Sequence, residues 1–395
     1  MESSSRNPGD LALPPPLDLS PKRFIETLCA RADIGINGDR PWDIQVHDQR
    51  FYGRVVSRGS LALGESYMDG WWDCADLAEF FNRLLRARLD RHFGKNLSTF
   101  LYFAAARLFN RQDRTRSAEV VDKHYDIGND IYLAFLDPYN QYTCGFFEDT
   151  DDLAIAQERK LDLICRKLRL RPGETLLDIG CGWGGLAKFA AERYGVRVTG
   201  ISISDEQITY AREFCKGLPV SIEHRDYREM QGAFDKVVSV GMLEHVGHKN
   251  YRTYMEVVNR VLRDDGLFLL HCIGGNGSTA ATDPWIDKYI FPNGMLPSIE
   301  QLGKAVDRLL VMEDWQNFGA YYDQTLHAWS KNFDAAWPKL KEKYGDIRFY
   351  RMWRYYFLMC AGTFRARVNQ VWQIVLTKSG AAEVYHRPQY GSGGS

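Results

Sequence analysis

The stretch LLDIGCGWGG, residues 176–185, is a glycine-rich loop of the kind that holds a nucleotide-like cofactor. Between a strand and a helix, such a loop brings backbone N–H groups close to a ligand, and the following helix N-terminus favours negative groups. Gly180, Gly182 and Gly184 form the GxGxG pattern of S-adenosylmethionine sites. A GxGxxG pattern of dinucleotide sites starts at the same glycine, so the loop alone leaves two cofactors open.

The residues around the loop favour S-adenosylmethionine. A dinucleotide site needs an Asp or Glu about 20 residues further on, at the end of the second strand, to bind a ribose. That strand ends in TGISIS, with Ser202 and Ser204 at this place. Asp178 precedes the first glycine, where a carboxylate would compensate the charged amino acid portion of S-adenosylmethionine and would repel a pyrophosphate. We therefore predict an S-adenosylmethionine site that includes these residues and Trp183, with a turn-capping role for Asp178 as the structural alternative.

The end of the third strand offers side chains for the adenosine. In HRDYRE, Asp226 can bind the adenine amine, Tyr227 can cover the ring face, and Arg228 completes this predicted set. A plain core position for Tyr227 is the structural alternative. Gln207 is a further candidate, but SDEQ makes it part of a capping-box pattern with Ser204, so a structural role is nearly as well supported.

Two further polar residues follow apolar strands at the same predicted edge of the sheet. Glu244 follows the fourth strand in GMLEHVGHKNY, and His271 ends the fifth strand in LFLLHCIGG. Ligands of open parallel sheets bind beyond the carboxyl ends of the strands, and polar groups buried there are costly unless hydrogen-bonded or functional. We therefore predict that both residues belong to the site, and we assign the nearby His245 and His248 to loop or surface packing.

An alternation of strands and helices from residue 174 onward must position these residues. The predicted strands are ETLLDIG, VRVTGIS, PVSIEHR, FDKVVSVG and GLFLLHCIG, with LLVMEDW and QVWQIVLTK as two more near the C-terminus. Helical stretches separate the first five. This rhythm predicts a doubly wound α/β fold with a seven-stranded, mostly parallel sheet.

A smaller unit precedes the α/β fold. Residues 1–18 are rich in Ser, Pro and Gly, and we expect them to be disordered. Residues 19–120 are predicted to form an N-terminal α+β domain, in which FYGRVVSRGSLALGESYMDGWW mixes short strand-like runs with glycine turns before a helix. Residues 121–390 form the larger domain, and the closing GSGGS, residues 391–395, is interpreted as an artificial remnant.

The composition is that of a soluble or peripheral globular protein. A chain of 395 residues with 45% hydrophobic and 26% charged residues can build two cores. Its start lacks the order of a signal peptide, and no run approaches the roughly 20 apolar residues of a spanning helix. A formal net charge of −1 gives no global attraction to nucleic acid, so we expect no such partner. Eight scattered cysteines without a CxxC pair argue against a metal site or a disulfide framework and predict a reducing, cytoplasmic location.

Six motifs in order closely resemble those of the bacterial cyclopropane-fatty-acyl-phospholipid synthases, relatives of the mycolic acid cyclopropane synthases. They are HYDIGNDIY, DPYNQYTCGFFE, LLDIGCGWGG, GMLEHVGHKNY, LHCIGG and FGAYYDQTL. The resemblance is strong over residues 120–388, and the N-terminal domain resembles that of the bacterial phospholipid enzymes. It implies a Rossmann-like class I S-adenosylmethionine-dependent methyltransferase fold, and methylene addition across a cis double bond of an unsaturated acyl chain in a membrane phospholipid.

The resemblance also implies the proton acceptor. In this family the alkene takes the methyl group, a carbocation forms, and loss of a methyl proton to a bound bicarbonate ion closes the ring. By matching motif positions, the ion's ligands would be Cys144, Glu244, His271, Tyr322 and the backbone of Ile273. A protonated His271 or the Tyr322 hydroxyl could donate to the ion, and Glu244 could accept from its O–H. From the residues alone, a plain buried Cys144 and a core Tyr322 are equally open.

By the same resemblance, Tyr125, Tyr142 and Thr143 would contact the cofactor. The substrate lies in a bilayer, so we expect peripheral association with the inner face of a membrane. Residues 83–116 bracket an apolar run with Lys and Arg, and each basic group near anionic lipid adds about 1 kcal/mol. The same residues could instead pack on the larger domain or on a second subunit, and we expect a homodimer.

Other functions fit parts of the sequence. A methyltransferase of the same family could act on another lipid, to give a methyl-branched chain, or on a small amine. An inactive membrane-binding protein could keep the same scaffold. An NAD-dependent oxidoreductase is disfavoured by the missing acid after the second strand.

Overall fold

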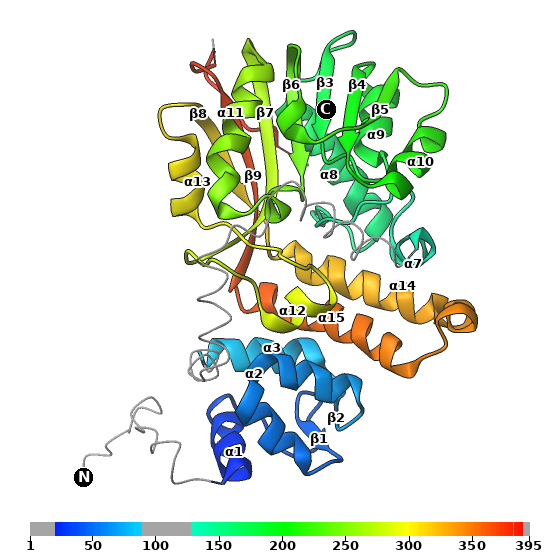
Figure 1. Ribbon diagram of the computed structural model, residues 1–395, viewed down its shortest axis with the longest axis vertical. Coiled ribbons are helices and arrows are strands. Elements are labelled where there is room, and N and C mark those ends of the chain that lie inside the picture. Colours follow the sequence, from blue (N-terminus) through cyan, green and yellow to red (C-terminus); the bar gives the residue numbers. More distant parts are fainter. Residues whose placement is uncertain (1–19, 89–127, 382, 390–395) are drawn as a thin grey trace.

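The computed structural model describes residues 20–88, 128–381 and 383–389, so most of the predicted basic segment and Tyr125 lie outside the described residues (Figure 1). The N-terminal module contains α1 (Pro21–Arg31), β1 (Ile44–Val46), α2 (Arg50–Met68), β2 (Trp72–Cys74) and α3 (Leu77–Arg86). The larger unit contains the helices α7 (Asn129–Phe135), α8 (Leu153–Lys167), α9 (Gly185–Tyr194), α10 (Asp205–Phe214), α11 (Tyr251–Val261), α12 (Pro284–Tyr289), α13 (Ile299–Val306), α14 (Tyr321–Tyr344) and α15 (Ile347–Arg365). Three short 3₁₀ turns also belong to it: η2 (Tyr227–Glu229), η3 (Leu243–His245) and η4 (His248–Asn250).

The strands of the larger unit form one seven-stranded sheet in the order β5-β4-β3-β6-β7-β9-β8. They are β3 (Thr175–Ile179), β4 (Arg197–Ser202), β5 (Val220–His224), β6 (Phe234–Val240), β7 (Leu262–Gly275), β8 (Val311–Asn317) and β9 (Asn369–Thr377). The first five pair in parallel, and β9 runs antiparallel to both of its neighbours. All seven predicted strands and the mostly parallel sheet are therefore confirmed.

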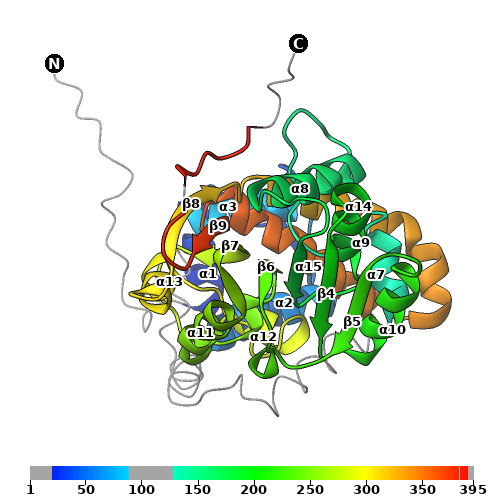
Figure 2. The same cartoon turned by 90° about the horizontal axis from the view of Figure 1, so that it is seen from above.

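Helices cover both faces of the sheet and its carboxyl edge (Figures 1 and 2). One core joins α8 and α9 to the sheet, and another joins α11 and α13 to the opposite face. The pair α14 and α15 lies across the carboxyl edge, between the sheet and the N-terminal module (Figure 1). Among the described helices, none is long and apolar enough to span a bilayer.

The strand-like runs predicted between residues 51 and 72 are wrong, because most of this stretch is the helix α2. Its buried side chains, such as Phe51, Val55 and Leu63, recur at helical spacing. Gly59 adopts φ 58° and ψ −136°, so the helix kinks there. The β-branched residues and glycines of this stretch have local propensities for strands and turns. These propensities are weak, and the free energy gained by burying one face of a helix outweighs them. The two strands of the module, β1 and β2, are only three residues long each.

The N-terminal module joins the larger unit where α3 packs on α15. Gly362 makes this close approach possible, since an added Cβ would lie 2.5 Å from Phe81 Cβ and 2.7 Å from the Ala78 carbonyl oxygen. Arg365 Nη1 also donates to Glu79 Oε2 at 3.2 Å across this contact. The position of the module therefore depends on a glycine in α15.

We expect Gly362→Ala to lower the free energy of unfolding by about 1–3 kcal/mol, because the two backbones must move apart. Gly303→Ala is the matched control, since Gly303 is exposed in the helix α13 and an added Cβ meets nothing within 4 Å. The control should be neutral or up to about 1 kcal/mol more stable. Equilibrium denaturation of both variants tests this, and equal stability changes would contradict the close-approach argument.

Candidate active site

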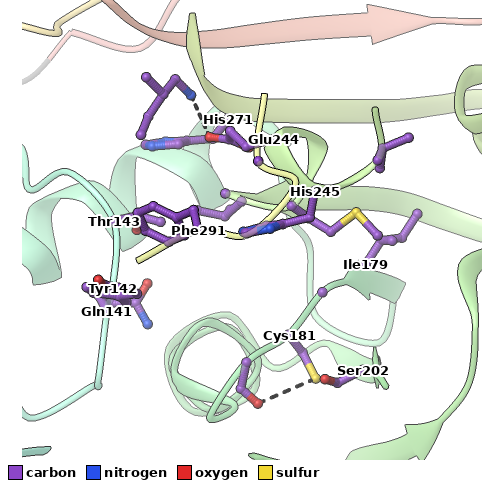
Figure 3. A pocket seen from close by; sticks show the side chains of 18 of the residues that line it. Gln141, Tyr142, Thr143, Ile179, Cys181, Ser202, Glu244, His245, His271 and Phe291 are labelled. Carbon is purple, nitrogen blue, oxygen red and sulfur yellow. Dashed lines mark hydrogen bonds between the residues drawn. The ribbon is translucent and has the colours of Figure 1, made fainter. Parts of the chain in front are cut away.

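A cavity of about 280 Å³ opens at the carboxyl ends of β3, β4, β6 and β7. Figure 3 shows Glu244 and His271 toward one end of it and Cys181 and Ser202 toward the other. The predicted site residues that line it are Tyr142, Thr143, Asp178, Gly180, Gly182, Trp183, Ser202, Gln207, Asp226, Tyr227, Arg228, Glu244, His271, Ile273 and Tyr322. Cys144, Gly184 and Ser204 do not line it. The predictions for the cofactor and for the base therefore meet in one space.

The glycine loop follows β3 with a backbone that glycine makes possible. Gly180 has φ 84°, and an added Cβ would lie 2.7 Å from the Met242 side chain. Its N–H donates to the Ile201 carbonyl at 3.0 Å, which ties the loop to β4. Gly184, at φ 82°, occupies the N-cap position of α9, where an added Cβ would lie 3.0 Å from Cys215 Sγ. Gly184 therefore has a structural role here, while Gly180 faces the cavity.

Asp178 is the charged residue nearest this loop in sequence, on β3. Its side chain is 2% exposed, and Oδ2 has no hydrogen-bond partner among the described residues. Burial raises the pKa of its carboxyl to about 7, and the charge of Lys160 opposes that rise. A buried carboxylate oxygen without a partner fits a ligand that brings a cationic group, such as the amino acid portion of S-adenosylmethionine.

The end of β4 departs from the predicted capping box. Ser204 Oγ accepts the Gln207 N–H at 3.4 Å, but the Gln207 side chain does not return to Ser204. Gln207 Oε1 accepts instead from Ser202 Oγ at 3.3 Å, and Ser202 Oγ accepts the Ser204 N–H at 3.2 Å. Half of the capping box is therefore formed, and the Gln207 side chain is held beside Ser202 at the cavity wall.

The third strand is followed by a turn that orients its polar residues. Asp226 accepts from the Arg228 N–H at 2.9 Å and from Arg228 Nη1 at 3.0 Å. The Tyr227 ring lies 5.0 Å from the Tyr254 ring, so Tyr227 is packed into the core and also lines the cavity. Tyr227 therefore holds the core position of the structural alternative and also reaches the cavity wall.

Glu244 lies on η3, immediately after β6, and is 7% exposed. Its Oε1 accepts the Ile273 N–H at 2.7 Å, while Oε2 has no partner among the described residues. Burial raises the pKa of its carboxyl to about 7, and the Ile273 N–H opposes that rise. The backbone of Ile273 was predicted to hold the ion, and in the structure its N–H is already used to orient Glu244.

His271 lies on β7 and is 2% exposed. Its Nδ1 is 3.3 Å from Nε2 of Gln373, the residue opposite it on β9. Burial lowers the pKa of His271 well below its ordinary range, and the charges of Lys160 and Lys167 add to this. Burial therefore disfavours the protonated imidazole, which was one of the two donors expected for the ion. When Gln373 donates to Nδ1, the neutral ring carries its proton on Nε2.

Cys144 and Tyr322 differ in their access to the cavity. Cys144 is fully buried, its Sγ lies 3.9 Å from Thr325 Oγ1, and burial raises the pKa of its thiol. It is a buried thiol rather than a thiolate. Tyr322 lines the cavity, and its ring lies 4.5 Å from that of Phe364, so it is both a core aromatic and a site residue.

Sequence reasoning missed several residues at the site. His245 was assigned to loop or surface packing, but it lines the cavity 5.8 Å from the Phe291 ring, and burial lowers its pKa to about 4 (Figure 3). Gln141 also lines the cavity, and Gln373 contacts His271 from a strand about 100 residues further on in the sequence. Only His245 carried a sequence signal, because it directly follows Glu244.

The sheet order, the glycine loop and the cavity together define a class I S-adenosylmethionine-dependent methyltransferase fold. A family model described as mycolic acid cyclopropane synthetase matches residues 112–374. The chain belongs to this family, and it is an S-adenosylmethionine-dependent enzyme.

Individual relatives agree with this assignment. The chain is 51% identical to the cyclopropane-fatty-acyl-phospholipid synthase of Escherichia coli (strain K12), over 90% of this chain and 93% of that protein. The solved mycolic acid cyclopropane synthase CmaA1, complexed with SAH and CTAB, is 30% identical, with a TM-score of 0.61 over 66% of this chain and 98% of that one. Coclaurine N-methyltransferase, 20% identical with a TM-score of 0.66 over 80% of this chain and 99% of that one, shares the fold.

The pKa of Glu244 predicts how stability depends on pH. Its folded pKa is raised from 4.5 to about 7, so this contribution to stability is fully present below about pH 4.5 and is lost as the pH rises through 7. We expect the unfolding free energy of wild type, minus that of Glu244→Gln, to fall by up to about 1.4 kcal/mol per pH unit between pH 5 and 7. Chemical denaturation at several pH values measures this difference. Glu206→Gln, at an exposed position of α10, is the control, and a flat difference for Glu244→Gln would contradict the prediction.

Proposed function

We propose that this protein transfers a methylene group from S-adenosylmethionine across the cis double bond of an unsaturated acyl chain in a membrane phospholipid, forming a cyclopropane ring. The observation that carries the proposal is a single cavity lined by the glycine loop, by Glu244 and His271, and by apolar side chains. The close similarity to the Escherichia coli synthase supports the same reaction. S-adenosylmethionine, when bound, supplies an electrophilic methyl group.

The cofactor side of the cavity is assigned from its polar groups. Asp178 would hold the cationic amino group, and its unpaired Oδ2 supports this role. Asp226, held by Arg228, would accept from the adenine amine, and Tyr227 would cover the ring. Gln207 stays beside Ser202 at the same wall. Among these acceptors, Asp178 Oδ2 is buried without a partner in the described part of the chain, so it is the group that most needs one from a ligand.

The opposite wall suits an acyl chain. Its apolar lining residues include Ile286, Leu296, Leu326, Tyr356 and Phe364. They come from α12, the segment after it, α14 and α15. An alkyl cation formed here would be trapped by water, so a dry wall protects the reaction as well as binding the lipid.

The base in this proposal is a bicarbonate ion held between Glu244, His271 and Tyr322. Ionised Glu244 would accept the ion's O–H at Oε2, and neutral His271 would donate its Nε2–H. The ion would take a proton from the added methyl carbon, and the C–H electron pair would close the ring. Ile273 would orient Glu244 through its N–H, and Cys144 would support the site from outside the cavity.

We expect purified protein, S-adenosylmethionine and vesicles of unsaturated phospholipid to give acyl chains that gain one CH₂ and lose the double bond, seen by mass spectrometry and NMR. Glu244→Gln should lower turnover by about 10²- to 10⁴-fold, as the loss of general base catalysis does. Cys144→Ser should be milder, because Cys144 does not line the cavity. Buffer stripped of carbon dioxide should slow the reaction, and added bicarbonate should restore it.

The same assay decides among the alternatives. A methyl-branched chain would indicate a lipid methyltransferase of the same family, and methylation only of a small amine would indicate an N-methyltransferase. A protein that binds vesicles without turnover would be an inactive scaffold. Full activity of Glu244→Gln without any bicarbonate dependence would mean that another group takes the proton.

The proposal includes a homodimer that docks peripherally on the inner face of an anionic membrane. The support is the basic and apolar segment 83–116, of which residues 89–116 lie outside the described part of the chain. We expect sedimentation with anionic vesicles at low salt and release at high salt, because salt screens exposed charges. Charge reversal of Arg111, Arg114 and Arg116 should weaken this binding. Unchanged sedimentation would assign the segment a structural role, and light scattering measures the oligomeric state.

A further inference from the structure

Lys160, on α8, is a wholly buried lysine that does not line the cavity but supports its wall. Its Nζ donates to Gln141 Oε1 at 2.6 Å and to Thr143 Oγ1 at 2.9 Å. Both acceptors line the cavity. A buried ammonium is costly, so a lysine whose donors end on two cavity residues suggests a role at the site rather than in the core.

A second buried residue of α8 holds the same segment. Gln157, one helical turn before Lys160, donates from Nε2 to the Thr143 carbonyl at 2.8 Å. Asp137 fixes the start of the segment by accepting the N–H groups of Tyr139 and Gln141 at 2.8 Å and 2.7 Å. Residues 141–143 are therefore held from behind, and their side chains face the cavity (Figure 3).

Lys160 also interacts electrostatically with the side of the cavity that is assigned to the cofactor. Burial lowers the pKa of Lys160 to about 7, and the charges of Asp137 and Asp178 oppose that shift. The charge of Lys160 in turn acts to lower the pKa of Asp178, against the rise that burial causes. Lys160 thus links the wall segment 141–143 to the carboxylate assigned to the cofactor.

We propose that Lys160 is a positioning residue for S-adenosylmethionine, holding residues 141–143 against the cofactor site through its hydrogen bonds to Gln141 and Thr143. Replacing Lys160 should weaken cofactor binding, because residues 141–143 would lose two of the hydrogen bonds that hold them in place. The effect should fall on cofactor affinity and on the KM for the cofactor, with a smaller change in the KM for the lipid.

Lys167 provides a matched control on the same helix. It is also wholly buried, burial likewise lowers its pKa to about 7, and its Nζ lies 4.0 Å from Asp314 Oδ2, a residue that does not line the cavity. Lys160→Met and Lys167→Met therefore each replace a buried lysine by an apolar side chain of similar length. A general effect of losing a buried lysine should appear in both variants.

The test is calorimetric titration of the full chain with S-adenosylhomocysteine, beside thermal unfolding of each variant. We expect Lys160→Met to lose about tenfold or more in affinity, as the loss of a charge-assisted hydrogen bond does, and Lys167→Met to stay within about twofold of wild type. Asp178→Asn is the positive control for lost binding. Wild-type affinity of Lys160→Met, or equal losses in the two lysine variants, would overturn the proposal.

A conservative pair keeps the test decisive if a methionine variant does not fold. Lys160→Gln retains a neutral donor, so its affinity should lie between those of wild type and Lys160→Met, while Lys167→Gln should bind like wild type. Equal affinities of the two glutamine variants would also overturn the proposal.

The inference rests on the proposed function only for the cofactor, and its readout needs no lipid. If no methylene transfer is found but the two lysine variants still differ in binding, the proposed lipid reaction fails and the role of Lys160 stands. If transfer is found but the two lysine variants bind the cofactor alike, the proposed lipid reaction stands and the proposed role of Lys160 fails.

Discussion

Desolvation of ionisable groups at one edge of the sheet sets the electrostatics of the cavity. Burial raises the pKa of Asp178 and of Glu244 to about 7 and lowers the pKa of His271 well below its ordinary range. The charged form of each group is better solvated in water than in the protein. Packing elsewhere in the fold must therefore supply the free energy that keeps these groups buried.

The helix pair α14 and α15 meets that requirement by closing the carboxyl edge of the sheet. It brings Tyr322, Leu326, Tyr356 and Phe364 to the cavity wall. Aromatic contacts such as that between Tyr322 and Phe364 add packing energy at the same place. The N-terminal module packs on the outer side of α15, so it supports the helix pair from the side away from the sheet.

Sequence patterns pointed to cavity residues near the carboxyl ends of strands. Asp178 was singled out by the glycine loop that follows it, and Glu244 and His271 by the apolar strands that lead to them, because parallel strands bring their carboxyl ends together. Lys160 and Gln373 could not be found in this way. A lysine on a helix normally belongs to the solvated face, and only the three-dimensional packing of α8 on segment 141–143 turns it inward. The contact between Gln373 and His271 depends on strand order, which local patterns do not encode.

The fold of the N-terminal module was the least predictable part. Glycines and β-branched residues in 51–72 obey local propensities that the packing of α2 overrides. The proton state of His271 was also beyond the sequence, because it depends on burial and on Lys160 and Lys167, which lie far away along the chain.

The position of β9 has a consequence for biosynthesis. This strand lies between β7 and β8, yet it follows all the other described helices and strands in the chain. Until it emerges from the ribosome, β7 and β8 each present an open edge that could pair with another nascent chain. His271 also lacks the partner that orients its ring until that moment. The sheet therefore reaches its native strand order, and His271 gains its partner, only after the N-terminal module and the other described helices and strands have been synthesised.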